Sequence, residues 1–246
     1  MPIPVYLKTQ PVMARPTDPE FYMLAKDGLY FCRNHPFFES DVPARHPPRS
    51  LAEQESQCQF RFPKLSRPAL EYIVGFFDRV FQIHRSESVV LLLWNMDAQH
   101  YKIVVPEQEA TVSESYGGRS PLDVRYQTPP LLPRHLLIGD IHCHGDIGAY
   151  ASFTDRLDEK HRDGFHGIIG RIEREPPEFH LEMSVDGHRF PVAFDDIFEG
   201  YERRRDFVHP DWLKRVSVKV ERPWSSRSYV DPRDWYAAGK NKKRWD

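Results

Sequence analysis

Apolar residues recur along this chain in short periodic stretches that are separated by polar, proline-containing segments. The clearest stretch is 68–84, PALEYIVGFFDRVFQIH, in which apolar side chains return at steps of three and four residues. This period places them along one face of an amphipathic helix. Gly75 either weakens this helix or marks a place where another segment packs closely against it. We therefore expect a helix over 68–84 with its apolar face on a core.

An apolar run follows the helix directly, and it predicts a buried strand over 87–94, ESVVLLLW. Polar residues at 95–99 predict a hairpin loop, and residues 100–105 are expected to form the strand that pairs with 87–94. Residues 106–134 are polar and contain prolines, so we expect a long loop there with a short strand near 124–127. Long ordered loops in compact domains are often functional, so this segment is a candidate functional region.

The second half of the chain repeats the alternation of strand and helix patterns. We expect strands at 136–144, 166–173 and 178–185, and helices at 151–162 and 195–205. Asp186-Gly187 predicts a hairpin turn after the last of these strands. The order of helix, strands, helix, strands and helix predicts an α/β or α+β fold with a mixed β-sheet flanked by helices.

The two ends of the chain lack comparable periodicity. We expect residues 1–66 to form an irregular N-terminal extension with a short strand at 28–32. We expect residues 67–205 to form the folded domain that contains the sheet and helices. Residues 206–246 suggest a C-terminal tail. Its tryptophans indicate that it docks on another surface, and it ends in a basic run at 240–244 that is typical of a solvated terminus. These tryptophans include Trp212, Trp224 and Trp235.

Composition narrows the class of protein. The formal net charge of the 246 residues is −2, so no overall charge favours a nucleic-acid or membrane partner. The longest apolar run, 89–94, is too short to span a membrane, and the first residues lack the apolar stretch of a signal peptide. Three cysteines form no disulfide framework. We therefore expect a cytoplasmic protein. Separately, the basic cluster Arg203–Arg205 is expected to be either solvated or in contact with an acidic partner.

Two histidines in the 136–144 strand carry the strongest chemical signal. Side chains two apart in a strand share a face, so His142 and His144 point one way and Cys143 the other. Two imidazoles on one face are a ready pair of zinc ligands, although such a pair is also common without a metal. The candidates for a third ligand are Asp146, Asp155, Asp158 and His161.

Among these candidates, Asp155 has the most favourable context. Ser152-x-x-Asp155 predicts a helix start, which would aim both side chains back toward the end of the strand. Two histidines and a carboxylate leave a zinc ion one open position, as in catalytic sites. By itself, Ser152 is also explained as a helix cap. Asp140 and Asp146 flank the histidines and either orient them or are solvated carboxylates.

These residues together match a known signature. The chain resembles JAMM (MPN/JAB) metalloproteases at every fixed position of their H-x-H-x7-S-x2-D pattern. The matching residues are His142, His144, Ser152 and Asp155. That family also has a glutamate at the start of a buried strand after a helix, where this chain has Glu87. The resemblance covers roughly 67–200 and is greatest to the bacterial JAB branch. Members of that branch accompany ubiquitin-like proteins and their activating and conjugating enzymes.

The resemblance implies an MPN/JAB-like fold and a zinc-dependent, deubiquitinase-like isopeptidase with one zinc ion per chain. It implies that His142, His144 and Asp155 hold the zinc and that Glu87 is the general base. It also implies that Ser152 donates a hydrogen bond to the oxyanion and that the segment 106–134 contacts the substrate. The implied partners are a ubiquitin-like protein or its conjugates and the activating and conjugating enzymes of that system, for example in antiphage defence.

The chain departs from the family pattern at three positions. Cys143 stands where serine is common, and Val90 and Trp94 stand where small residues are frequent. Of these, Trp94 would narrow the neighbourhood of the site.

Three other interpretations remain open. The chain can be a non-catalytic MPN-type scaffold, despite having all five polar positions. Residues 139–142, GDIH, resemble the opening motif of calcineurin-like phosphoesterases, whose downstream motifs are absent. His142-x-His144-x-Asp146 resembles the H-x-H-x-D-H motif of metallo-β-lactamases, but Ile147 replaces the final histidine.

Overall fold

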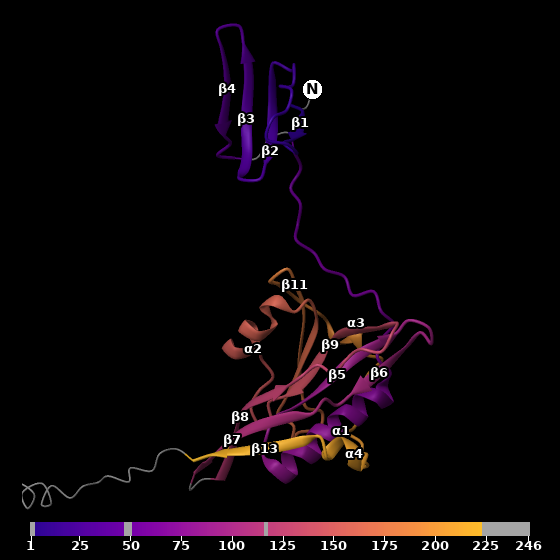
Figure 1. The fold of residues 1–246 in the computed structure, drawn as a ribbon. Helices are drawn as coiled ribbons and strands as arrows, with labels where there is room; N and C mark the ends of the chain where they lie inside the picture. Colours follow the sequence, from indigo (N-terminus) through magenta and orange to yellow (C-terminus); the bar gives the residue numbers. More distant parts are fainter. Residues whose placement is uncertain (1–2, 47–50, 116–117, 223–246) are drawn as a thin grey trace, which may run out of the picture. The chain divides into compact units, whose positions relative to one another are not determined.

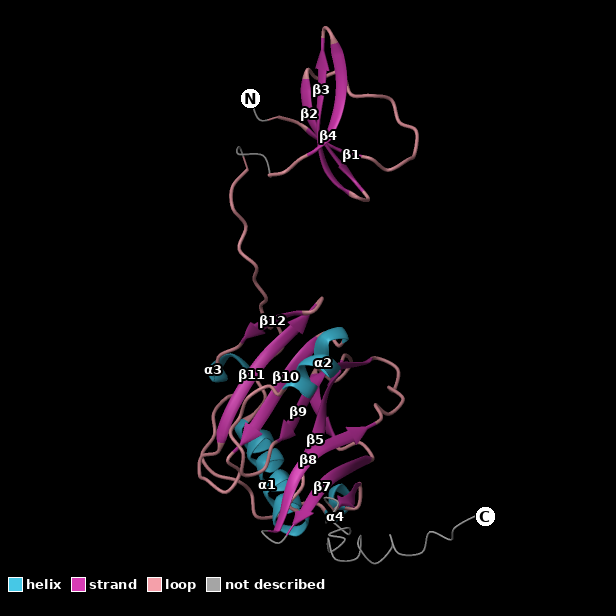
Figure 2. Ribbon diagram, turned by 90° about the vertical axis from the view of Figure 1, so that its left-hand side faces the viewer, coloured by secondary structure: helices cyan, strands magenta, loops and turns pink. Residues whose placement is uncertain are grey.

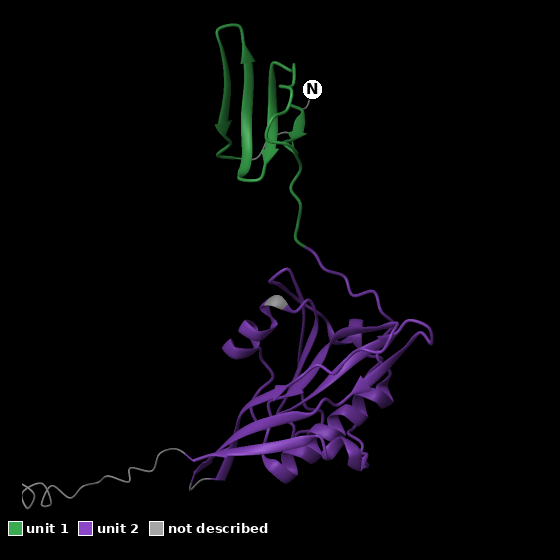
Figure 3. Cartoon of the chain, viewed as in Figure 1, with its two compact units in different colours: residues 1–56 green, residues 57–246 purple. Residues whose placement is uncertain are grey.

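The chain folds into two compact units, which divide at residues 56 and 57 (Figure 3). The structure is a computed structural model that describes residues 3–46, 51–115 and 118–222, without the side chain of His161. The class is the expected one, with mixed β-sheets and short and long helices in the C-terminal unit (Figure 1).

The N-terminal unit is a four-stranded sheet, so the expectation of an irregular extension is wrong. Its strands follow chain order: β1 (Val5–Leu7), β2 (Glu20–Ala25), β3 (Gly28–His35) and β4 (Phe38–Pro43). β1 and β2 are parallel, and the other pairs are antiparallel. The alternation in EFYMLA and GLYFCRNH buries Phe21 and Cys32, which face each other across the β2–β3 pair. The predicted strand at 28–32 is the first part of β3.

The central sheet of the C-terminal unit has six strands in the order β12-β11-β10-β9-β5-β6 (Figure 2). β9 and β10 are parallel, and every other neighbouring pair is antiparallel. The six strands are β5 (Ser88–Asn95), β6 (His100–Val104), β9 (His135–Cys143), β10 (Gly164–Gly170), β11 (Glu178–Val185) and β12 (His188–Pro191). These are the predicted strands, with ends shifted by a few residues. The turn at Asp186-Gly187 has positive φ at both residues, as a type I′ turn requires.

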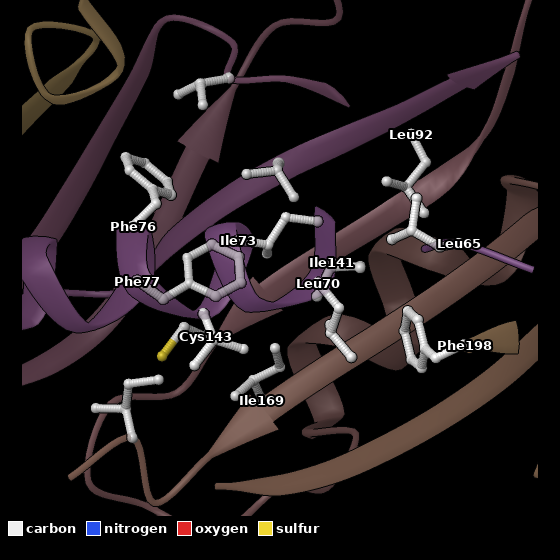
Figure 4. Packing of buried hydrophobic residues seen from close by; sticks show 14 of the residues in the cluster. Leu65, Leu70, Ile73, Phe76, Phe77, Leu92, Ile141, Cys143, Ile169 and Phe198 are labelled. Atoms are coloured by element: carbon white, nitrogen blue, oxygen red, sulfur yellow. The ribbon is translucent and has the colours of Figure 1, made fainter. Parts of the chain in front are cut away.

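Helix α1 (Arg67–His84) covers one face of this sheet and forms the core with it. The predicted apolar stripe is buried, and Figure 4 shows Ile73 and Phe77 in the same cluster as Ile141 and Cys143 of β9. Gly75 marks close packing: a Cβ there would lie 2.2 Å from the carbonyl oxygen of Arg205.

A second, three-stranded sheet replaces most of the loop expected at 106–134. Its order is β13-β7-β8, formed by β7 (Gln108–Ser115), β8 (Gly118–Tyr126) and β13 (Val216–Glu221). β13 runs parallel to β7 although the two are about a hundred residues apart in sequence. The side chain of Gln108 fixes this sheet to β5, since its amide accepts from the N–H of Val89 at 2.9 Å and donates to the carbonyl of Val89 at 3.0 Å.

The remaining helices are short. They are α2 (Phe153–Asp158), which continues into the 3₁₀ turn η1 (Glu159–His161), α3 (Phe194–Ile197) and α4 (Pro210–Leu213). The helix expected at 195–205 is therefore limited to a single turn. After it, Arg204 and Arg205 form ion pairs with Asp78, Glu175 and Glu71 within the same unit.

The segment after residue 205 belongs to the C-terminal unit as far as it is described. Trp212 packs edge-on against Tyr72 and Phe76 of α1, which confirms that this part of the expected tail is docked. Trp224, Trp235 and the basic run 240–244 lie outside the described residues. The three cysteines are free. Within the described ranges, no helix has the length and apolar character needed to cross a membrane.

Candidate metal centre

Three side chains predicted as metal ligands come together at the end of β9. The Nε2 atoms of His142 and His144 are 3.1 Å apart. Nε2 of His142 lies 3.5 Å from one carboxylate oxygen of Asp155, and Nε2 of His144 lies 3.4 Å from the other. The two imidazoles are buried, and the side chain of Asp155 is 18% exposed. Nitrogen and carboxylate donors at these separations can hold a metal ion.

Local structure explains why both histidines face the same way. In β9, Ile141 and Cys143 enter the core against α1, so His142 emerges from the opposite face of the sheet. Cys143 points away from the histidines as predicted, and burial raises the pKa of its thiol. The backbone N–H of His144 donates to the carbonyl of Ile169 on β10, which continues the strand geometry past residue 143.

Asp155 is placed by the start of α2. The Oγ of Ser152 accepts from the N–H of Asp155 at 3.2 Å, and the carboxylate of Asp155 accepts from the N–H of Ser152 at 2.7 Å. This reciprocal pair is a capping box. It fixes the side chain of Asp155 at the helix N-terminus with its carboxylate turned toward the histidines. The N-cap role expected for Ser152 is therefore present.

Glu87 lies immediately before β5 and lines a small cavity beside the three side chains. The cavity has a volume of about 60 Å³, and His142 and Asp155 also line it. Burial raises the pKa of Glu87, although the two histidines act against this shift. A carboxylate with a raised pKa is a better proton acceptor near neutral pH. From β8, Asp123, Val124 and Tyr126 close the cavity, so part of the segment expected to contact substrate does lie there.

The electrostatics of the group favour positive charge. Burial alone would lower the pKa of His142, but the hydrogen bond and charge of Asp155, with the charges of Asp140 and Glu87, raise it to about 9. The two histidines hold the pKa of Asp155 far below its usual range, despite its burial. The field that retains a proton on His142 also favours a bound cation.

Neither Asp146 nor Asp158, two of the other candidate ligands, belongs to this group of donors. Asp146 is exposed and belongs to neither metal-binding group found among the described residues. Asp158 lines the cavity but is not in these groups either. The side chain of His161 is outside the described part of the structure. Trp94 packs against Phe62 and Tyr101 in the core and does not line the cavity, so it does not narrow the site.

A second group of potential donors consists of Asp140, His142 and Glu159, but its carboxylates already have partners. Arg162 binds Asp140, and Arg189 binds Glu159 with an N–O distance of 2.7 Å. These carboxylates are thus neutralised by arginines. Asp140 also accepts from His166, which is buried on β10, and this explains why His166 is not a ligand.

Sequence reasoning missed the residues that hold the site in place. Gln108 fixes the strand that follows Glu87, and Tyr126 and Arg162 contact Asp140 beneath the site. The alternation of Gln108, Ala110 and Val112, all buried, was a signal for β7, but a polar and a small residue obscured it. Comparison with known proteins adds no family: no family model matches the chain, and no curated protein sequence matches it at a significant level.

Proposed function

We propose that this protein is a zinc-dependent peptidase or isopeptidase of the JAMM type that cleaves after the C-terminus of a ubiquitin-like protein. The observation that carries the proposal is the spacing of the three donor groups. A tetrahedral ion with bonds of about 2.0–2.1 Å requires its donor atoms to be about 3.3 Å apart. The two Nε2 atoms are 3.1 Å apart, and each lies 3.4–3.5 Å from a different carboxylate oxygen of Asp155, so the three groups are close to the spacing that zinc needs.

In this proposal, His142, His144 and Asp155 hold the zinc ion, which supplies a Lewis acid and activates water at neutral pH. Glu87 orients the attacking water from the cavity wall, accepts its proton and passes that proton to the leaving amine. The hydroxyl of Ser152 uses its lone pair for the helix cap, which leaves its proton free to stabilise the carbonyl oxygen of the substrate. Water is added across the C–N bond, and a carboxylate and an amine result.

The substrate class rests on the sequence resemblance, since the bacterial JAB branch accompanies ubiquitin-like proteins. Residues of β8 and α2 line the cavity beside Glu87, and we place the substrate tail against these two elements. Activating and conjugating enzymes of the same system are the further proposed partners.

Metal content and two variants test the centre. Purified protein should hold about one zinc ion per chain, and His142→Ala or Asp155→Ala should lose most of it because each removes a ligand. Two metal ions per chain, or full zinc content in both variants, would contradict the assignment.

Glu87→Gln tests the reaction. Since Glu87 is not a ligand in this proposal, the variant should keep its zinc and its melting temperature. Turnover of a ubiquitin-like protein fused through its C-terminus to a reporter should fall by about 10²–10⁴-fold. Near-normal turnover would mean that another group is the base. Absence of cleavage by the zinc-loaded wild type, or hydrolysis of a phosphoester instead, would favour the scaffold or phosphoesterase interpretation.

A further inference from the structure

The helix that carries Asp155 is not held to the sheet by an apolar face. No side chain of α2 is buried, and its largest apolar residues, Phe153 and Leu157, are 77% and 54% exposed. Helices in proteins normally gain their stability from packing an apolar face, and a six-residue helix is too short to be stable alone. Another interaction must therefore fix the position of Asp155.

Polar contacts at the C-terminal end of α2 provide this attachment. Glu159 follows α2 directly, is 3% exposed, and its backbone N–H donates to the carbonyl of Asp155. The carboxylate of Glu159 lies 2.7 Å from a guanidinium nitrogen of Arg189 on β12 and 3.7 Å from Nδ1 of His166 on β10. Its backbone carbonyl accepts from the hydroxyl of Ser184 on β11 at 3.2 Å. Three strands thus bind this one residue.

Arg189 is the charged partner of Glu159 in this attachment of α2 to the sheet. Its side chain is 17% exposed and lies between Glu159 and Glu182 of β11, to which its Nε donates at 2.5 Å. A guanidinium holds its nitrogens in one plane, so Arg189 can contact Glu159 and Glu182 at the same time. Without it, the buried carboxylate of Glu159 would keep only His166, 3.7 Å away, as a charged partner, and a poorly compensated buried charge moves toward water.

We propose that Arg189 is a positioning residue for the metal centre and acts through Glu159. The ion pair fixes the end of α2 and, one helical turn away, the direction of the Asp155 carboxylate toward His142 and His144. Metal ligands must be held within about 0.5 Å of their productive positions. Within the described residues, no hydrogen bond or ion pair joins Arg189 to the three donor side chains, so its effect is indirect. This inference rests on the proposed metal binding.

Arg204 offers a matched control. Its side chain is 16% exposed and forms ion pairs with two carboxylates, Asp78 at 2.9 Å and Glu175 at 2.7 Å. It thus resembles Arg189 in burial and partners, but it binds α1 and the loop between β10 and β11 rather than α2. Both arginines should contribute similarly to stability, and only Arg189 should affect the metal.

The experiment compares Arg189→Met with Arg204→Met in the full chain. Zinc affinity is measured by competition with a chromogenic chelator, well below the melting temperatures of the metal-free proteins. We expect Arg189→Met to weaken zinc binding by about 10-fold, the lower end of the cost of losing a direct partner of a metal ligand because Arg189 acts one residue further away, and Arg204→Met to change it by less than about 2-fold. Both variants should lower the melting temperature of the metal-free protein.

Arg189→Lys and Arg204→Lys form a milder pair in case the methionine variants do not fold. Lysine keeps the charge but not the planar fork, so Arg189→Lys should bind zinc more weakly than wild type and Arg204→Lys should not. Equal zinc affinity in the Arg189 variants and wild type, or an equal loss in the Arg204 variants, would overturn the positioning role alone. Failure of the wild type to bind zinc would overturn this role and the proposed metal centre together.

Discussion

At the scale of single residues, two side chains near the metal centre carry assignments that experiments can separate. Ser152 is a helix cap in the structure and an oxyanion donor in the proposed reaction. His166 lies beneath the centre between buried carboxylates and is not a candidate ligand.

Ser152→Ala and Ser152→Asn separate the two roles of Ser152. Alanine removes the cap and should lower the free energy of unfolding by about 0.5–2 kcal/mol, whereas asparagine is a favoured capping residue. We expect Ser152→Asn to keep near-wild-type melting and zinc content while its turnover falls at least ~100-fold, because its bulkier amide cannot replace the hydroxyl as donor. If the asparagine variant cleaves normally while alanine only lowers stability, Ser152 is a cap alone.

His166 should make stability depend on pH. Its Nε2 lies 3.1 Å from the carbonyl of Arg162 and its Nδ1 3.3 Å from the carboxylate of Asp140, so both nitrogens face acceptors and the imidazolium is favoured. Burial would lower the pKa of His166, but the hydrogen bond and charge of Asp140 raise it above its ordinary value. Its contribution to stability is therefore fully present below about pH 6.5 and is lost as the pH rises through the raised pKa.

Urea unfolding of wild type and His166→Gln across this range measures that contribution. The difference in unfolding free energy between the two proteins should be largest near about pH 6 and shrink toward about pH 9. A difference that stays constant across the range would show that folding does not raise the pKa of His166.

At the scale of elements, α1 shows how a helix position is fixed by what packs on it. Gly75 lies in the interior of α1, where alanine would normally be preferred by about 1 kcal/mol. Here the added methyl group would meet the backbone of Arg205, which cannot turn away as a flexible side chain can.

We expect Gly75→Ala to destabilise the protein by about 1–3 kcal/mol despite the gain in helix propensity, as overpacked cores do. The measurement is the midpoint of urea unfolding at constant m-value. Gln82→Ala on the exposed side of the same helix is the control and should change stability by less than about 0.5 kcal/mol. A Gly75→Ala variant more stable than wild type would mean that the segment at 205 moves aside at no cost.

At the scale of the whole molecule, the chain consists of two units, each with its own sheets. Residues 51–57 between them are exposed and have no regular secondary structure, whereas Phe60 and Phe62 already pack on the core of the C-terminal unit. The complete metal centre lies in that unit.

Protease Glu-C should therefore cut after Glu53 or Glu55 and release an intact C-terminal fragment, since exposed segments of this kind are preferred cleavage sites. We expect the fragment to keep the zinc content of the full chain and its melting temperature. Mass spectrometry identifies the cut, and metal analysis with thermal unfolding tests the fragment. Aggregation of the fragment or loss of its zinc would show that the N-terminal unit supports the other.

The sequence by itself determined the elements whose pattern is local. The 3.6-residue period of 68–84 defined α1, and the apolar run of 89–94 defined β5. The two-residue period of a strand placed His142 and His144 on one face and Cys143 on the other, because a strand fixes these directions without reference to the rest of the chain. The capping sequence at Ser152 likewise defined the start of α2.

Only the tertiary structure decided what lies far apart in sequence. The sequence did not predict three features: the pairing of β13 with β7, the four-stranded N-terminal sheet and the ion pair between Glu159 and Arg189. Strand pairing and buried ion pairs depend on residues that are distant in sequence, so a short stretch of sequence does not reveal them. The approach of Asp155 to within 3.5 Å of the histidines is of the same kind. The signature suggested that these three groups meet, and the capping box of α2 and the polar contacts of Glu159 set their distances.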